Sequence, residues 1–227
     1  MVLATSAGAQ EPASDTGGAE IVVTGHRPMR VDAKILRAAQ ARFAEDRIEL
    51  SPQGVLQFEL WRGNKRVRAD GVKLALMDAA GREIPVTIDG NGRIAFAPVP
   101  KGRWFLTAPA QASDLSLRPI ILSSGTRIDD RRLGDLRLQC RVMVSMAKAK
   151  ASLLAMPLIG MFDAIGGCAS KRFGFYHRTE QSLAGAVAVA PGGTPKVLPM
   201  SATRDAYLPP LSDRTMDNET RIRTTYQ

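Results

Sequence analysis

The hydrophobic pattern of this 227-residue chain changes its period once, close to residue 54. Before that point the apolar residues recur at the spacing of one helix face, and Asp32 stands where an N-cap would be. These apolar positions are Ile35, Leu36, Ala39 and Phe43. The pattern therefore predicts an amphipathic helix over residues 32–47.

From Gly54 onward, apolar and polar residues alternate in short runs, as they do in strands that bury one face. The runs lie at residues 55–60, 72–76, 84–88, 94–96, 104–106, 117–122 and 136–144. Turn residues separate them at Asp78–Gly81, Asp89–Gly92 and Pro100–Gly102. Strands at a spacing of roughly ten residues are typical of an antiparallel β-sandwich. We therefore expect a mostly β chain with a prealbumin-like or Ig-like sandwich over residues 51–144.

The alternation stops over residues 145–170. The apolar run in this stretch is interrupted by Pro157, Gly160 and Asp163, and it is too short to span a bilayer. We interpret the stretch as an apolar connector and expect no membrane span. Alternation then returns and predicts a C-terminal β extension over residues 171–227, either as a second small β unit or as strands added to the first.

Residues 1–19 are rich in small and polar side chains. Ala7-Gly8-Ala9, followed by Gln10, has the form of a secretory cleavage site, although no charged region and hardly any apolar region precedes it. We favour a signal-peptide remnant and a disordered leader over a chance run of small residues. Residues 20–50 then hold an extended peptide and the predicted helix.

The chain has two cysteines, Cys140 and Cys168. In an exported protein they are expected to form one disulfide, and in a cytosolic protein two buried thiols are the better interpretation. The leader favours the disulfide.

The formal net charge is +9, which is compatible with a partner such as nucleic acid, an anionic surface or an acidic polymer. The basic residues are dispersed, and their densest clusters fall at predicted turns, residues 62–68 and 131–132. Residues 129–132 are interpreted as a solvated turn. Because no nucleic-acid motif accompanies these clusters, we expect no nucleic-acid partner and a solvated basic surface.

Motifs of catalysis are absent from the sequence. It has two histidines, His26 and His177, and lacks the nucleophile elbow, the zinc-protease helix motif and the phosphate-binding loop. His177 falls on an apolar strand face, where a structural histidine is the expected role. We predict no catalytic, cofactor-binding or metal-binding residues, and no enzyme activity.

The stretch from Gly71 to Ala108 carries a family resemblance. Asp78 with Gly81, Asp89 with Gly92, and the run from Val99 to Trp104 follow the order of turns and aromatic strands seen in carboxypeptidase regulatory-like domains. The resemblance extends over about residues 54–144. It implies a prealbumin-like sandwich that stabilises, links or binds rather than catalyses.

A shorter resemblance lies near the start of the chain. The peptide "IVVTG-x-R" is similar to the segment near the TonB-contacting box of TonB-dependent outer-membrane receptors. Its residues are Ile21, Val22, Val23, Thr24, Gly25 and Arg27. An extended β-branched peptide is suited to docking by strand addition. The alternative is an edge strand that pairs with the protein's own sheet.

Together these observations predict a non-enzymatic, exported cell-envelope protein, periplasmic or outer-membrane-associated in a Gram-negative-type cell. Its expected work is binding or scaffolding of an envelope protein or an anionic envelope polymer. The alternative is an accessory of TonB-linked uptake that docks a TonB-type protein through residues 20–27.

Overall fold

The computed structural model of the chain describes residues 29–108, 114–152, 160, 162, 167–171 and 174–227. Its helices are α1 (Ala33–Leu50), α2 (Leu133–Lys150), and the short 3₁₀ helices η1 (Ala69–Gly71) and η4 (Gly167–Ala169). Its strands are β1 (Arg30–Asp32), β2 (Gly54–Arg62), β3 (Lys65–Val67), β4 (Ala75–Asp78), β5 (Glu83–Pro85), β6 (Thr87–Ile88), β7 (Ile94–Ala95), β8 (Trp104–Thr107), β9 (Leu115–Ser123), β10 (Asp130–Arg132), β11 (His177–Arg178), β12 (Leu183–Val189), β13 (Lys196–Val197), β14 (Ala206–Tyr207) and β15 (Arg221–Tyr226). The leader, His26 and the peptide at residues 20–27 lie outside the described residues.

Helix α1 begins where its sequence predicts. The Asp32 carboxylate accepts a hydrogen bond from the backbone N–H of Lys34 at 2.8 Å, so it caps the first turn. The buried positions Leu36 and Ala39 lie on the predicted apolar face. The prediction of an N-terminal amphipathic helix is therefore confirmed, and the helix continues to Leu50.

Two antiparallel sheets make up the first part of the fold. Sheet I has the strand order β1-β8-β4-β5. Sheet II has the order β3-β2-β7-β6, and β9 pairs with β2 along its whole length, from Gly54 opposite Ser123 to Arg62 opposite Leu115. Both sheets contribute to one hydrophobic core, through side chains such as Leu106 of sheet I and Phe58 of sheet II. This arrangement is consistent with the expected β-sandwich.

The C-terminal part forms a further antiparallel sheet, as the sequence predicts. Sheet III has the order β10-β15-β12-β13, and β11 pairs separately with β14. Sheet III has a smaller core of its own, which includes Leu183, Tyr207 and Ile222.

Residues 136–144 are not a strand, and that prediction is wrong. They lie inside α2, so the described residues hold two α-helices where the sequence predicted one. The apolar residues that alternate here also recur every fourth residue, and the fold uses that helical spacing: Leu138, Val142 and Met146 pack into the core of sheets I and II.

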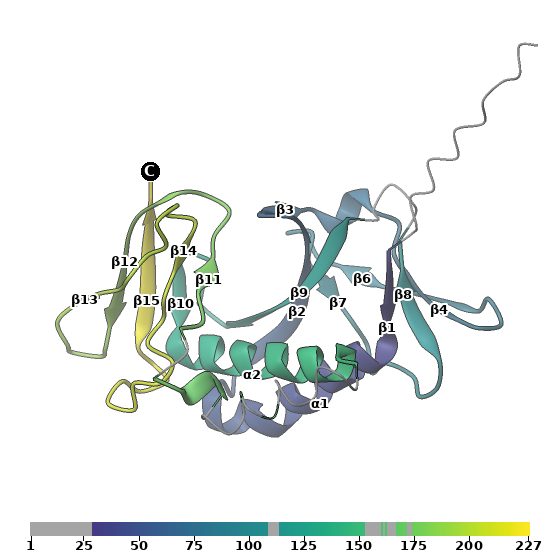
Figure 1. The fold of residues 1–227 in the computed structure, drawn as a ribbon, viewed down its shortest axis with the longest axis horizontal. Helices are drawn as coiled ribbons and strands as arrows, with labels where there is room; N and C mark the ends of the chain where they lie inside the picture. The colour runs from purple at the N-terminus through teal and green to yellow at the C-terminus, as the bar shows by residue number, and fades with distance from the viewer. Residues whose placement is uncertain (1–28, 109–113, 153–159, 161, 163–166, 172–173) are drawn as a thin grey trace, which may run out of the picture.

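Helix α2 connects the two β parts of the protein. Its first turn contributes Leu133 and Leu136 to the core of sheet III, whereas its later turns pack against α1 and β9. Figure 1 shows α1 and α2 side by side beneath the strands, with α2 reaching from sheet III to sheets I and II. No helix among the described residues is long and apolar enough to cross a membrane.

Candidate functional site: a central cleft

The outer face of sheet II carries an unusual set of side chains. Because side chains alternate along a strand, Phe58 and Leu60 of β2 face the core, whereas Glu59 and Trp61 face outward. Arg118 lies directly opposite Glu59 on β9 and shares this outer face. In a two-layer sandwich the outer face is solvated and polar. Here Glu59 and Trp61 are buried.

These side chains are covered by Arg118, which lies over Trp61, and by Arg66 and Arg93, which contact Glu59. Between the outer face, α2 and the segment around β11 lies a cavity of about 330 Å³, which we call the central cleft. Sheet II supplies Glu59, Trp61, Arg118 and Ile120 to its walls. Helix α2 supplies Leu136, Gln139, Cys140 and Met143 as its floor, and the opposite wall includes Phe175, Tyr176, His177, Arg178, Pro209 and Leu211. Cavities of this size that combine apolar walls with a few polar groups are typical of ligand sites.

Arg118 lies over the ring of Trp61, with the guanidinium carbon 4.4 Å from the ring centroid. Its Nη2 donates to the carbonyl of Gly63 at 3.0 Å. No carboxylate among the described residues ion-pairs with it. Partial burial, followed by repulsion from Arg178, lowers the pKa of Arg118, and Glu59 offsets part of this shift. Within the described part of the chain, a guanidinium at the cleft wall is therefore left without an ion-pair partner.

Glu59 is not free to be that partner. One of its carboxylate oxygens accepts from Arg93 Nε at 3.0 Å and lies 3.2 Å from Arg66 Nε. The other accepts from the indole N–H of Trp61 at 3.3 Å. A buried carboxylate that has two arginines and an indole around it is already compensated. It also holds the Trp61 ring in place.

Ion pairs and hydrogen bonds close one rim of the cleft. Asn64, in the turn between β2 and β3, accepts from Arg178 Nη1 at 2.6 Å, and Arg178 pairs with Asp205 at 2.9 Å. Arg66 reaches Glu180 at 3.5 Å. These contacts connect sheet II to the C-terminal part of the chain on the side opposite α2.

Behind the cleft wall lies a fully buried arginine. Arg131 of β10 donates to His177 Nε2 at 3.0 Å, to Gln139 Oε1 at 2.8 Å and to the carbonyl of Ile121 at 2.6 Å. Its solvent exposure is 0%, and no carboxylate of the described residues ion-pairs with it. The interpretation of residues 129–132 as a solvated turn is therefore wrong, because the second half of this segment is a buried strand.

His177 lies between this arginine and the cleft. Arginine only donates, so Nε2 of His177 accepts and the ring proton belongs on Nδ1. Burial, together with the positive charge of Arg131, lowers the pKa of His177 well below its ordinary value of 6.5. The ring also packs against Tyr207, with centroids 5.2 Å apart. His177 is thus held neutral, with an N–H for which the described residues supply no acceptor.

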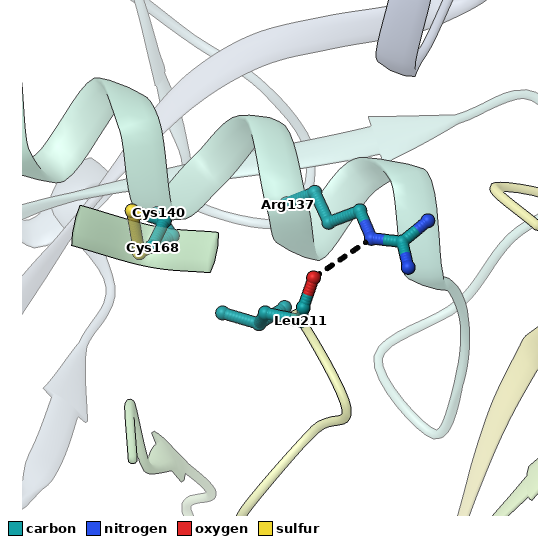
Figure 2. Close-up of a disulfide and its surroundings, with 4 residues drawn as sticks. All are labelled: Arg137, Cys140, Cys168 and Leu211. Atoms are coloured by element: carbon teal, nitrogen blue, oxygen red, sulfur yellow. Dashed lines mark hydrogen bonds between the residues drawn. A yellow bond between two sulfur atoms is a disulfide. The ribbon is translucent and has the colours of Figure 1, made fainter. Parts of the chain in front are cut away.

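The floor of the cleft is fixed by a disulfide between Cys140 of α2 and Cys168 of η4, which Figure 2 shows. The predicted disulfide is therefore present. One turn earlier on α2, Arg137 points toward the C-terminal loop and donates to the carbonyl of Leu211 at 3.1 Å. It also donates to the Asn218 side chain and to the carbonyls of Asp213 and Met216. The cleft residue Leu211 is thus anchored to the helix that forms the floor.

A second polar cluster lies where α1, β9 and α2 meet. The carboxylate of Asp135 accepts from the hydroxyls of Ser51 and Ser123, both at 2.6 Å, and from the backbone N–H of Ser123 at 2.9 Å. Arg132 donates to Ser123 and pairs with Glu219. Both serines are buried, and neither they nor Asp135 line the central cleft. The arrangement suits a structural junction rather than nucleophilic catalysis.

Among the described residues, no group of three or more His, Cys, Asp or Glu side chains is placed to hold a metal ion. Comparison of the chain with protein-family models, with curated proteins and with solved structures finds no match. The functional argument therefore rests on the geometry of the cleft.

The sequence reasoning missed Trp61, Arg118 and Arg131 as parts of a site. Two signals in the sequence could have indicated the first two residues. Trp61 lies at an odd position of β2, whereas the core residues Phe58 and Leu60 lie at even ones. Arg118 interrupts the apolar run at residues 117–122. Both place a large side chain on the face of a sandwich that is normally solvated.

Proposed function

We propose that the protein is a non-enzymatic, exported cell-envelope protein that acts as a binding module, and that the central cleft is its ligand site. One observation carries the proposal. The outer face of sheet II, which a simple sandwich leaves in water, holds a buried Trp61 at the wall of a 330 Å³ cavity. Arg118 lies over this ring and has no ion-pair partner among the residues that the structure describes. Burial of this kind at a cavity wall is typical of a ligand-binding surface.

Two features support export to the envelope. The disulfide between Cys140 and Cys168 is typical of proteins that fold in an oxidising compartment. The cleavage-like residues Ala7-Gly8-Ala9 point the same way.

A binding role is favoured over catalysis by the chemistry of the cleft wall. His177 has a lowered pKa and its Nε2 is occupied by Arg131, so it is poorly suited to take up a proton from a nucleophile. The buried serines bond to Asp135 away from the cleft. A saturable turnover of a small substrate that a point mutation abolishes would overturn the non-enzymatic proposal.

We also propose that sheets I and II form a prealbumin-like sandwich of the carboxypeptidase regulatory-like kind. The turns that carry the resemblance are supported by local geometry. Asp78 and Asp89 each accept from backbone N–H groups two and four residues on, which tightens the two turns. The sandwich ends with β9 on this proposal, because β10 belongs to sheet III and α2 follows it.

A second candidate function is docking of a TonB-type protein by the peptide at residues 20–27. The observation in its favour is that β1 follows this peptide closely and is an edge strand of sheet I. Pull-down with a TonB C-terminal domain tests it. Capture that is unchanged after deletion of residues 20–27 would remove this candidate.

The cleft proposal is tested by native mass spectrometry of protein purified from the cell envelope. Wild-type protein is expected to retain a small molecule, or to take one up from an envelope extract. The variant Met143→Trp fills the floor of the cleft and is expected to lose it. Val197→Trp, at a 76% exposed position, is the matched control and is expected to retain it. Equal retention by all three proteins, or by none, would contradict the proposal.

A further inference from the structure

The charge balance of the cleft favours one class of ligand. Each carboxylate of the cleft region already has an arginine partner: Glu59 has Arg66 and Arg93, Glu180 has Arg66, and Asp205 has Arg178. Arg118 at the wall and Arg131 behind it have no carboxylate partner among the described residues. The cleft therefore carries a surplus of positive charge beside partly buried walls, where electrostatic attraction is stronger than in bulk water.

Two polar side chains of the cleft, Arg118 and His177, keep hydrogen-bond donors. The guanidinium of Arg118 uses one nitrogen for the carbonyl of Gly63 and keeps further N–H groups. His177 keeps its Nδ1–H, because Arg131 occupies Nε2. A ligand that meets these two side chains must accept hydrogen bonds, and a negative charge on the acceptor is favoured by the arginine.

The remaining lining includes several apolar side chains beside the polar Gln139 and Thr179. These apolar side chains are Ile120, Ile128, Leu136, Met143, Phe175 and Leu211. The cavity volume of about 330 Å³ lies at the lower end of the range for small-molecule sites. An anion that is small and fully hydrated, such as inorganic phosphate, would leave this apolar lining without contact.

We propose that the central cleft binds a small amphiphile with one anionic head group, a carboxylate or a phosphate, on an apolar body. The head group lies against Arg118 and His177, and the body lies along α2. The inference rests on the proposed function, since it names the ligand class of the same cleft. Arg118 sets specificity for the head group, and Trp61, which lies beneath it, reports on occupancy.

Titration followed by tryptophan fluorescence tests the inference. The chain has two tryptophans, and Trp104→Phe leaves Trp61 as the single reporter. The probes are decanoate and decyl phosphate below their micelle concentrations, which separate the two head groups. Decanol and decylamine test charge, and acetate and inorganic phosphate test the need for an apolar body. We expect saturable binding of at least one ten-carbon anion, weaker at high salt, and no saturation with the short anions.

Arg118→Met in the same background is expected to lower the affinity for the anionic probe about 10- to 100-fold, because a hydrogen bond to a charged group is lost. Arg103→Met, which makes the same chemical change at an exposed position, is the control and is expected to bind normally. Circular dichroism and thermal unfolding of each variant establish that it is folded. His177→Gln provides a second variant, with a smaller expected loss.

The outcomes separate this inference from the proposed function. Equal binding of decanoate, decanol and decylamine would overturn the anionic specificity and leave the cleft as a ligand site. Binding that Arg118→Met and His177→Gln both leave unchanged would also overturn it. A third outcome is that neither ten-carbon anion saturates the fluorescence signal, while Met143→Trp still loses the molecule that the wild type retains from the envelope. This outcome would overturn the amphiphile class and leave the cleft as a ligand site. Loss of that retention difference would contradict the proposed function itself.

Discussion

Nη1 of Arg131 lies 3.0 Å from Nε2 of His177, so a permanently charged and fully buried guanidinium donates to the imidazole that forms part of the cleft wall. Protonation of His177 would place two positive charges in contact and remove the acceptor at the same time. The contact between Arg131 and His177 therefore makes the stability of the cleft wall depend on pH.

The first prediction concerns stability in mild acid. The pKa of folded His177 lies well below 6.5, whereas the unfolded chain keeps its ordinary value. As the pH falls below about 6.5, the unfolded state binds a proton that the folded state does not, so the free energy of unfolding decreases until the pH reaches the lowered pKa. The slope for one such proton is about 1.4 kcal/mol per pH unit. Urea unfolding at several pH values measures it.

The control for this prediction is His177→Gln. Glutamine keeps an acceptor for Arg131 but does not titrate, so its stability is expected to change less between pH 6.5 and 4.5. The aspartates with lowered pKa, such as Asp89 and Asp130, lose their contribution only as the pH falls below their ordinary value of 3.8. Equal slopes for the wild type and the variant in this window would contradict the role of His177.

The second prediction concerns Asp135. Asp135→Ala leaves the hydroxyls of Ser51 and Ser123 and the N–H of Ser123 without this buried acceptor. We expect a loss of about 3 kcal/mol or more in the free energy of unfolding, measured by chemical denaturation. Asp114→Ala is the control, because its pair with Arg62 is half exposed on both sides and is expected to contribute far less. Similar losses in the two variants would contradict a structural junction at Asp135.

The third prediction concerns the disulfide. Cys140 and Cys168 are separated by 28 residues, and closing a loop of that length stabilises a protein by about 3–4 kcal/mol in the chain-entropy model. The double variant Cys140→Ala/Cys168→Ala is expected to lose about this amount in denaturant unfolding. Reduction of the wild type should give a similar loss, and non-reducing peptide mapping should detect the bridge. A free thiol at either position in protein isolated from its own cell would contradict the pairing.

The fourth prediction concerns the contact between α1 and α2. A Cβ atom on Gly134 would lie 2.0 Å from the carbonyl oxygen of Leu50 and 2.9 Å from Cβ of Asn218. The Leu50 oxygen is a backbone atom and the Asn218 Cβ is attached directly to the backbone, so neither can move as a flexible side-chain end does. Gly134→Ala must therefore push α2 away from the end of α1. We expect a loss of about 1–3 kcal/mol. Gly71→Ala is the control, because its added Cβ meets no atom of the described residues within 4 Å, and it is expected to be neutral or slightly stabilising. Equal thermal shifts in the two variants would contradict the tight approach of the helices.

Local signals made the first part of the fold predictable. Asp32 followed by an apolar stripe specifies a capped helix within a few residues, and turns such as Asp78–Gly81 set the ends of neighbouring strands. The strand prediction at residues 136–144 failed because apolar residues at every second position, which is the strand repeat, also include residues four apart, which lie on one face of a helix. An apolar residue at every second position therefore also satisfies helical spacing, as at Leu136 and Cys140.

The site was less predictable, because it depends on contacts between residues far apart in the chain. Arg118 meets Trp61 only through the pairing of β2 with β9. Arg131 lies in a run of charged residues that is typical of a turn. Its burial depends on contacts such as the one with His177, which lies 46 positions later. No local pattern encodes such contacts.

The central claim is that the cleft between sheet II and β11 binds an amphiphilic anion, and chemical-shift mapping during separate titrations with decanoate and decyl phosphate tests it most directly. The indole N–H of Trp61 gives one of only two tryptophan side-chain signals in the chain. The largest saturable shifts are predicted at this signal and at the backbone of Gln139, Cys140 and Met143 in α2. Shifts that are absent from these residues with both probes, or that gather instead around Arg42 of α1 and Lys148 of α2, would contradict this claim.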